Sequence, residues 1–274
     1  MRWQADLAYG GNLTGVLSMG VSDQERYLFD LNGYLVVRGV LDPGEVARLN
    51  EVLDQQGLDD LDEAGREAAL EWLPNLGGPF LNLIDHQCIL PYLIDFVDER
   101  VRLDHSYGIQ MVAGSPGLDL HGFPDDRPRN CAWYHVRNGT ISAGLIVVSF
   151  ALTEVSAADG GFVCVPGSHK ANLPSPFLDK RANPDDPWLR HVELDAGDAV
   201  IFTEALTHGS LDWKGPGVRR ALFYKYAPGQ WAWLSHQWAP HELEPLTPRQ
   251  RAMVAAPGVV YAETRQERRP IEVA

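Results

Sequence analysis

A histidine and an arginine eleven residues apart are the residues of this chain best placed to do chemistry. His208 follows a run with strand composition, and Arg219 opens the next such run after a Lys-Gly-Pro-Gly turn. A neutral imidazole is a common metal ligand, and a planar guanidinium holds a carboxylate through two parallel hydrogen bonds. The pair therefore predicts a metal-ligating imidazole beside a carboxylate clamp, the combination that an iron enzyme using a 2-oxo acid requires.

Short strands must position these two side chains. From residue 101 onward the chain alternates β-type runs with glycine and proline, which is typical of a sandwich or barrel. The expected strands cover residues 103–113, 132–137, 144–152, 162–165, 191–194, 199–203 and 218–226. Alternation along the last of them predicts that Arg220 faces away from Arg219. The Pro-rich stretch 166–187 is a candidate lid, because compact domains rarely keep long loops without a function.

Helical patterns dominate the first third of the chain. Helices are expected over 22–31, from Asp42-Pro43 onward and over 85–99, with a strand at 34–37 between the first two. The prediction is one domain over 1–274, mainly β with peripheral helices. It comprises a helical scaffold over about 1–100, a β core over 101–228 and a C-terminal extension over 229–274.

Composition restricts the classes of partner. The 274 residues are 45% hydrophobic, enough for one large core, and the formal charge of -14 disfavours nucleic acid and anionic membranes. No apolar run is long enough to span a bilayer, and the first residues lack a signal-peptide core. Three scattered cysteines indicate neither a zinc knuckle nor a disulfide framework. We therefore expect a cytoplasmic monomer or homodimer that binds a small molecule.

Four motifs follow one another between residues 22 and 228. They are Asn32-Gly33-Tyr34-Leu35-Val36-Val37, Asp42-Pro43-Gly44-Glu45-Val46, Gly160-Gly161-Phe162-Val163-Cys164-Val165-Pro166-Gly167-Ser168-His169-Lys170, and Gly197-Asp198-Ala199-Val200-Ile201-Phe202 with His208-Gly209-Ser210. In this order they resemble the phytanoyl-CoA dioxygenase family. The resemblance implies a double-stranded β-helix (jelly roll), mononuclear non-haem Fe(II), and 2-oxoglutarate and dioxygen as co-substrates. It does not imply phytanoyl-CoA as the substrate, because one fold serves many substrates.

The resemblance also assigns roles to individual residues. It implies that His121 and His208 bind the iron and that Arg219 binds the distal carboxylate of 2-oxoglutarate. The family carries His-x-Asp at the first histidine, whereas this chain has His121-Gly122-Phe123. Phenylalanine cannot coordinate iron, so the family's third ligand is missing from its usual place.

Three sources for the missing carboxylate remain open. Glu204 shares strand parity with His208, but four extended residues span about 13 Å, so the chain must bend near Ala205 for both to bind one ion. Alternatively, Asp125 or Asp126 folds back from the following loop. The third possibility is an open position, as in iron halogenases that bind chloride there, although Phe123 is larger than the small residue such enzymes carry.

Three further residues complete the expectations. Tyr134 is a candidate to hydrogen-bond 2-oxoglutarate and His135 a candidate substrate contact, with a place in the core as the alternative for both. His169 is expected to hold its own loop rather than a metal. Hydroxylation of a small organic molecule is the expected reaction. The rival hypotheses are halogenation and a binding protein that has lost the metal.

Overall fold

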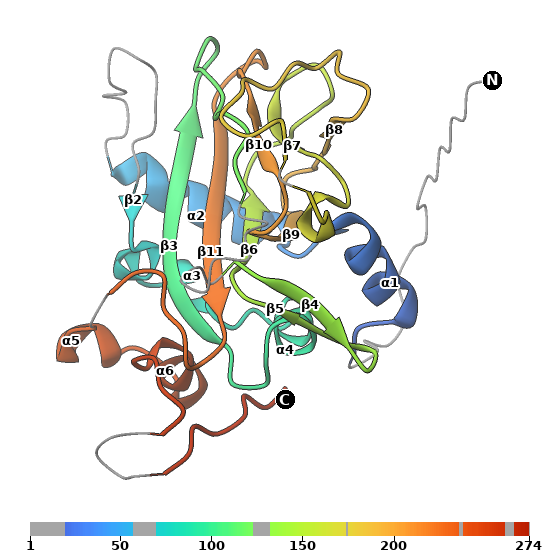
Figure 1. Ribbon diagram of the computed structural model, residues 1–274. Helices are drawn as coiled ribbons and strands as arrows, with labels where there is room; N and C mark the ends of the chain where they lie inside the picture. The colour runs from blue at the N-terminus through green and yellow to red at the C-terminus, as the bar shows by residue number, and fades with distance from the viewer. Residues whose placement is uncertain are drawn as a thin grey trace.

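Two antiparallel sheets form the body of the molecule (Figure 1). The computed structural model describes residues 20–56, 70–122, 132–173, 175–235, 238–260 and 266–273. A six-stranded sheet has the order β1-β9-β6-β11-β3-β2, a three-stranded sheet the order β10-β7-β8, and β4 and β5 form a hairpin. The strands are β1 (Tyr34–Val37), β2 (Leu70–Glu71), β3 (Arg102–Met111), β4 (Tyr134–Arg137), β5 (Thr140–Ala143), β6 (Ile146–Ala151), β7 (Gly161–Cys164), β8 (Arg190–His191), β9 (Ala199–Thr203), β10 (His208–Leu211) and β11 (Arg219–Ala227).

Helices cover the outer face of the large sheet. They are α1 (Asp23–Asn32), α2 (Pro43–Gln55), α3 (Pro79–Asn82), α4 (Leu90–Phe96), α5 (Pro240–Leu243) and α6 (Pro248–Val254), with short 3-10 turns η1 (Leu73–Leu76) and η2 (Ser168–Lys170). Capping boxes at Ser22 and Asp42 start α1 and α2. The prediction of a mainly β jelly roll with peripheral helices is confirmed. Among the described residues, no helix has the length and apolarity needed to cross a membrane.

The large sheet is buried on both faces, which accounts for the nearly continuous apolar runs of its strands. On β11, Leu222 and Tyr224 pack toward the helices, while Phe223 packs toward the small sheet. On β6, Val148 and Val147 divide in the same way. Successive side chains of a strand point to opposite faces. The inner face of the large sheet, between the two sheets, is therefore where the odd-numbered side chains of β11, including Arg219, must lie.

Two of the sequence motifs pack against each other. Gly33 ends α1 with φ +80, and a Cβ at this position would lie only 2.5 Å from Nδ1 of His169. His169 donates from Nε2 to the carbonyl of Asp30 at 3.0 Å, and the amide of Gly167 donates to the carbonyl of Asn32. The histidine thus ties its loop to the end of α1, as expected from the sequence.

Several elements differ from the sequence-based expectation. β5 and β10 were not foreseen, and the helix expected over 85–99 spans only Leu90–Phe96, because Pro91 starts it. The candidate lid packs instead on the outer side of the small sheet, where Phe177 and Trp188 lie against Leu120. Apolar side chains in the loop stabilise this position, so the loop is mainly a third layer.

Candidate metal centre and co-substrate pocket

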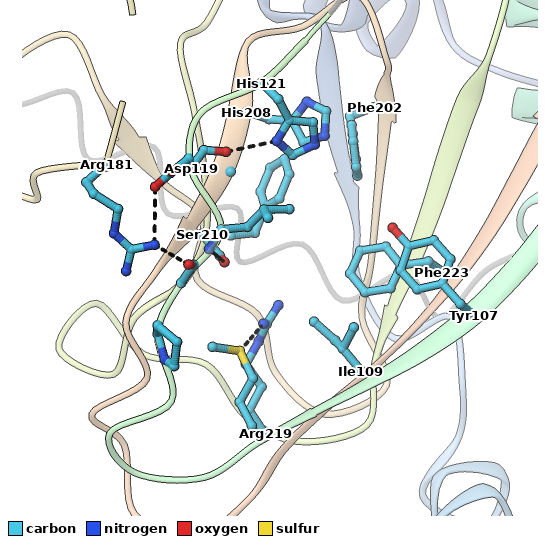
Figure 2. Close-up of a pocket in the computed structure, with 16 residues that line it drawn as sticks. Tyr107, Ile109, Asp119, His121, Arg181, Phe202, His208, Ser210, Arg219 and Phe223 are labelled. Carbon is cyan, nitrogen blue, oxygen red and sulfur yellow. Dashed lines mark hydrogen bonds and ion pairs between the residues drawn. The ribbon is translucent and has the colours of Figure 1, made fainter. Parts of the chain in front are cut away.

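A cavity of about 270 Å³ lies between the two sheets. Its walls carry His121 and His208 at one end and Arg219 at another (Figure 2). The stacked rings of Tyr107 and Phe223 form an apolar side wall, with centroids 4.9 Å apart. Ligand pockets usually measure roughly 300–1,000 Å³, so this cavity suits small molecules.

Three potential metal ligands converge beside this cavity. His121, Glu204 and His208 each offer a ligand atom, and these atoms lie within 4.8 Å of one another. The imidazole centroids of His121 and His208 are 4.2 Å apart. Glu204 and His208 are buried, whereas His121 is half-buried. Two imidazoles and one carboxylate are the donor set of non-haem Fe(II) sites that keep open positions for other ligands.

A bend in the chain brings Glu204 to the two histidines. β9 ends at Thr203, and the amide of Leu206 donates to the carbonyl of Thr203 at 2.9 Å, which closes a turn before β10 begins at His208. The extended separation of about 13 Å therefore does not apply. This is the bend near Ala205 that the sequence analysis required of Glu204.

Backbone pairing holds the two histidines face to face. The amide of each donates to the carbonyl of the other at 2.7 Å, so His121 extends the small sheet beside β10. The next residue, Gly122, packs closely against the carbonyl of Leu206, and an added Cβ would overlap that oxygen. A glycine is needed here because a side chain would separate the two segments.

The ring nitrogens of both histidines are oriented in the same way. Nδ1 of His121 lies 2.9 Å from the carbonyl oxygen of Asp119, and Nδ1 of His208 lies 2.7 Å from that of Leu206. A carbonyl only accepts, so each Nδ1 must carry the proton and donate it. Nε2 of each ring is then the unprotonated atom, which is the form that binds a metal.

The protonation states of the buried ligands also suit a cation. Burial alone would raise the pKa of Glu204, but the Lys225 ammonium and the two imidazoles lower that pKa to about 2. Burial, together with the neighbouring His121, lowers the pKa of His208 to about 3. Glu204 is therefore a carboxylate and His208 a neutral imidazole at neutral pH.

Arg219 is a buried cation that has no carboxylate partner among the residues the structure describes. Its side chain is 3% exposed, Nη1 lies 3.0 Å from Sδ of Met111, and Nε is a buried atom without a hydrogen-bond partner. Burial lowers the pKa of Arg219 to about 10, so it stays charged at neutral pH. Within the described residues it forms no ion pair. A buried guanidinium facing a cavity fits an anionic ligand such as 2-oxoglutarate.

Arg220 points the other way, as alternation along the strand predicts. Its guanidinium donates to Gln110 Oε1 at 2.9 Å and pairs with Asp54 at 2.6 Å on the outer side of the sheet. This contrast between adjacent arginines makes Arg220 a natural control for experiments on Arg219.

Two other candidate residues lie outside this cavity. The hydroxyl of Tyr134 donates to Asp30 Oδ1 at 2.8 Å, and its ring packs on His169. His135 is exposed on the same strand, and both residues line a separate surface hollow with Lys170. The structure does not bring either to the metal ligands. Their strand forms a hairpin with β5 and lies against α1 and η2 rather than in either main sheet.

The alternative third ligands fall outside the described part of the chain. Phe123, Asp125 and Asp126 belong to residues 123–131, which the structure does not describe. Glu204 is the carboxylate that joins the two histidines among the residues it does describe.

Residues not foreseen from the sequence also shape this region. Arg181 lines the cavity, donates to the carbonyl of Gly117 and pairs with Asp119 (Figure 2). It also pairs with Asp212. Lys225 pairs with Glu204 at 2.6 Å. Lys225 has the same strand parity as Arg219 and Phe223, and this was the signal in the sequence that could have revealed it.

The buried His169 should make the stability of the folded chain depend on pH. Burial lowers its pKa from 6.5 to about 4, with Lys170 adding to the effect. The unfolded chain therefore binds a proton as the pH falls below 6.5, while the folded chain does not, and stability falls down to about pH 4. We expect the free energy of unfolding to drop less in His169→Gln than in the wild type between pH 7.5 and 5.0, by about 2 kcal/mol. Urea unfolding at both pH values measures this, and equal drops would contradict it.

Comparisons with known proteins agree with this geometry. Residues 126–221 match the sequence model of the family described as phytanoyl-CoA dioxygenase (PhyH). The peroxisomal phytanoyl-CoA dioxygenase of Mus musculus is 22% identical over 245 residues, which cover 73% of this chain and 66% of the mouse protein. The alignment thus spans slightly less than two thirds of that relative.

Solved structures resemble more than three quarters of this chain. HygX from Streptomyces hygroscopicus, with nickel and 2-oxoglutarate bound, is 25% identical, with a TM-score of 0.68 over 78% of this chain and 89% of HygX. Other HygX structures hold iron, or nickel with 2-oxoglutarate and hygromycin B. The epimerase SnoN from nogalamycin biosynthesis is 22% identical, with a TM-score of 0.55 over 76% of this chain and 83% of SnoN, and shares the fold.

The donor set and the buried arginine are consistent with these similarities. Iron(II), 2-oxoglutarate and dioxygen are the cofactor and co-substrates of these enzymes. Over residues 126–221 the chain is similar to the phytanoyl-CoA dioxygenase family, and it shares its fold with structures that hold iron, or nickel and 2-oxoglutarate.

Proposed function

We propose that this enzyme hydroxylates a small organic molecule, with iron(II) held by His121, Glu204 and His208 and 2-oxoglutarate held by Arg219. The observation that carries the proposal is the convergence of the three ligand atoms within 4.8 Å at a cavity that also contains a buried guanidinium, which forms no ion pair with any described residue. A cluster of two histidines and a glutamate, or a buried arginine, occurs in many proteins that are not oxygenases. Together at one cavity they match the two ligands that the reaction needs.

In this proposal the side chains of the site bind and orient the metal and the co-substrate, and they take no covalent part in the reaction. Two imidazoles with protonated Nδ1 atoms and one carboxylate would hold the ion and would leave it able to bind further ligands. Arg219 holds the distal carboxylate of the diacid, and Phe162, Phe202 and Phe223 exclude water from the cavity. Iron(II) with 2-oxoglutarate and dioxygen supplies the oxidising chemistry that no side chain provides.

Glu204 favours hydroxylation over halogenation. Halogenation needs a vacant ligand position for chloride, and a carboxylate at Glu204 fills that position in the proposed centre. The bound hygromycin B in one HygX structure supports a small organic substrate in this chain as well. The formal charge of -14 further supports a small-molecule partner rather than nucleic acid.

Anaerobic spectroscopy tests the proposed ligand set. Addition of Fe(II) and 2-oxoglutarate to the purified chain should produce the weak visible charge-transfer band of a bidentate chelate. His208→Ala should remove the band, because it deletes a ligand that is 5% exposed and central to the cluster. On admission of oxygen, the wild type should form succinate slowly without added substrate. A wild type without either signal would leave the proposal untenable.

A further inference from the structure

Lys225 contacts the candidate ligand Glu204 and is not one of the residues that the sequence motifs single out. It lies on β11 six residues beyond Arg219, and an extended strand of that length measures about 20 Å. It therefore cannot hold the same carboxylate as Arg219. Its Nζ lies instead 2.6 Å from Oε1 of Glu204, and the two side chains are 14% and 3% exposed. Two nearly buried, oppositely charged groups in such close contact are costly to separate.

The surroundings of Lys225 fix the position of its ammonium. Nζ lies 5.4 Å from the centre of the Tyr107 ring, and that ring stacks on Phe223. The pairing of β11 with β3 shifts register between Lys225 and Tyr226. Such bulges re-aim side chains next to active sites. The Tyr107 ring and the β-bulge in β11 therefore fix the position of Lys225.

Glu204 is buried and its amide donates to the carbonyl of Leu145 at 2.9 Å, but its carboxylate depends on fewer contacts. It sits in the turn after β9 rather than on a strand, and among the described residues Lys225 is the one side-chain donor bonded to its carboxylate. A carboxylate on a turn can rotate about several bonds unless a neighbour fixes it. With Oε1 held by Lys225, Oε2 is left for other ligands.

We propose that Lys225 is a positioning residue of the metal centre, holding Oε1 of Glu204 so that Oε2 faces the two imidazoles. This inference rests on the proposed role of Glu204 as a ligand. Lys225 itself touches neither metal nor co-substrate in this arrangement. Loss of the residue that orients a ligand typically weakens metal binding 10–100-fold.

Nickel titration by calorimetry at pH 7.5 measures the effect without relying on turnover. Lys225→Met should raise the Kd for Ni(II) about 10–100-fold, and Lys225→Arg, which keeps the cation, should recover most of the affinity. Lys170→Met is the control, because Lys170 also pairs with a carboxylate, that of Asp30, but away from the cluster. Its Kd should equal that of the wild type.

A double-mutant cycle separates positioning from a general structural effect. In a Glu204→Gln background, which retains two imidazoles for nickel, Lys225→Met should cause no further change in Kd, because the group it orients is gone. An equal loss in both backgrounds, or no loss in the wild-type background, would overturn the inference. Lys225→Met leaves the buried carboxylate of Glu204 without its partner, which could disturb the fold. Lys225→Gln repeats the comparison with a side-chain amide that still donates a hydrogen bond, and it should raise the Kd for Ni(II) several-fold.

The same titrations separate this inference from the proposed function. If Glu204→Gln binds nickel as tightly as the wild type, Glu204 is not a ligand, and both the proposed ligand set and the role of Lys225 fall. If Glu204→Gln binds weakly while Lys225→Met and Lys225→Gln bind normally, the ligand set survives and the role of Lys225 alone is rejected.

Discussion

An Arg219→Met variant is expected to bind 2-oxoglutarate about 100-fold more weakly than the wild type. Arg219 is 3% exposed and has no carboxylate partner within the described residues, so in the proposed site its counter-charge would come from the diacid. Truncating one partner of a buried charge pair costs roughly 2–5 kcal/mol, and 1.4 kcal/mol corresponds to a tenfold change in Kd. Methionine preserves the apolar stem, so the fold should persist.

Calorimetry with 2-oxoglutarate on the nickel-loaded protein measures this loss. Arg220→Met is the control, because its guanidinium faces the opposite side of β11 and contacts Gln110 and Asp54. Nickel affinity should be unchanged in both variants, since neither arginine contacts the histidines. Binding of 2-oxoglutarate by Arg219→Met within about threefold of the wild type would exclude the clamp, and an equal loss in Arg220→Met would indicate a general disturbance of the strand.

Local patterns were enough to predict much of the framework. The strands at β9 and β11 were expected nearly as they occur, because apolar runs bounded by glycine and proline are local signals. The opposite orientation of Arg219 and Arg220 followed from alternation alone. β10 escaped notice because its four residues include Gly209 and its pairing depends on β7 and the segment around His121, which lie far away in the sequence.

The composition of the site depended on contacts that the sequence does not encode locally. Glu204 reaches the histidines only because the chain turns after Thr203, and a strand-based estimate separates them by about 13 Å. Tyr134 had the residue type expected of a cavity side chain, but its hydrogen bond to Asp30 places it near α1. Both outcomes arise from tertiary packing rather than from propensity or spacing.

The identity of the third ligand is the point on which the proposed chemistry depends most. A Glu204→Ala variant is expected to bind Ni(II) or Fe(II) at least about 100-fold more weakly and to lose its charge-transfer band, since removing a ligand should cost more than the 10–100-fold typical of a supporting residue. Asp125→Ala is the matched comparison, because Asp125 is the alternative third ligand. It belongs to residues 123–131, outside the described part of the chain. This variant should bind metal within about threefold of the wild type.

Rescue by a small acid distinguishes a lost ligand from a damaged fold. In Glu204→Ala the deleted carboxylate leaves a space beside His208 and the Lys225 ammonium, and formate fits that space with the same charge. Millimolar formate should therefore restore part of the nickel affinity in Glu204→Ala and none in His208→Ala, whose missing donor is an imidazole. If Asp125→Ala loses the metal while Glu204→Ala retains it, the family's carboxylate has moved within the loop after His121, and Glu204 serves instead as the counter-charge of Lys225.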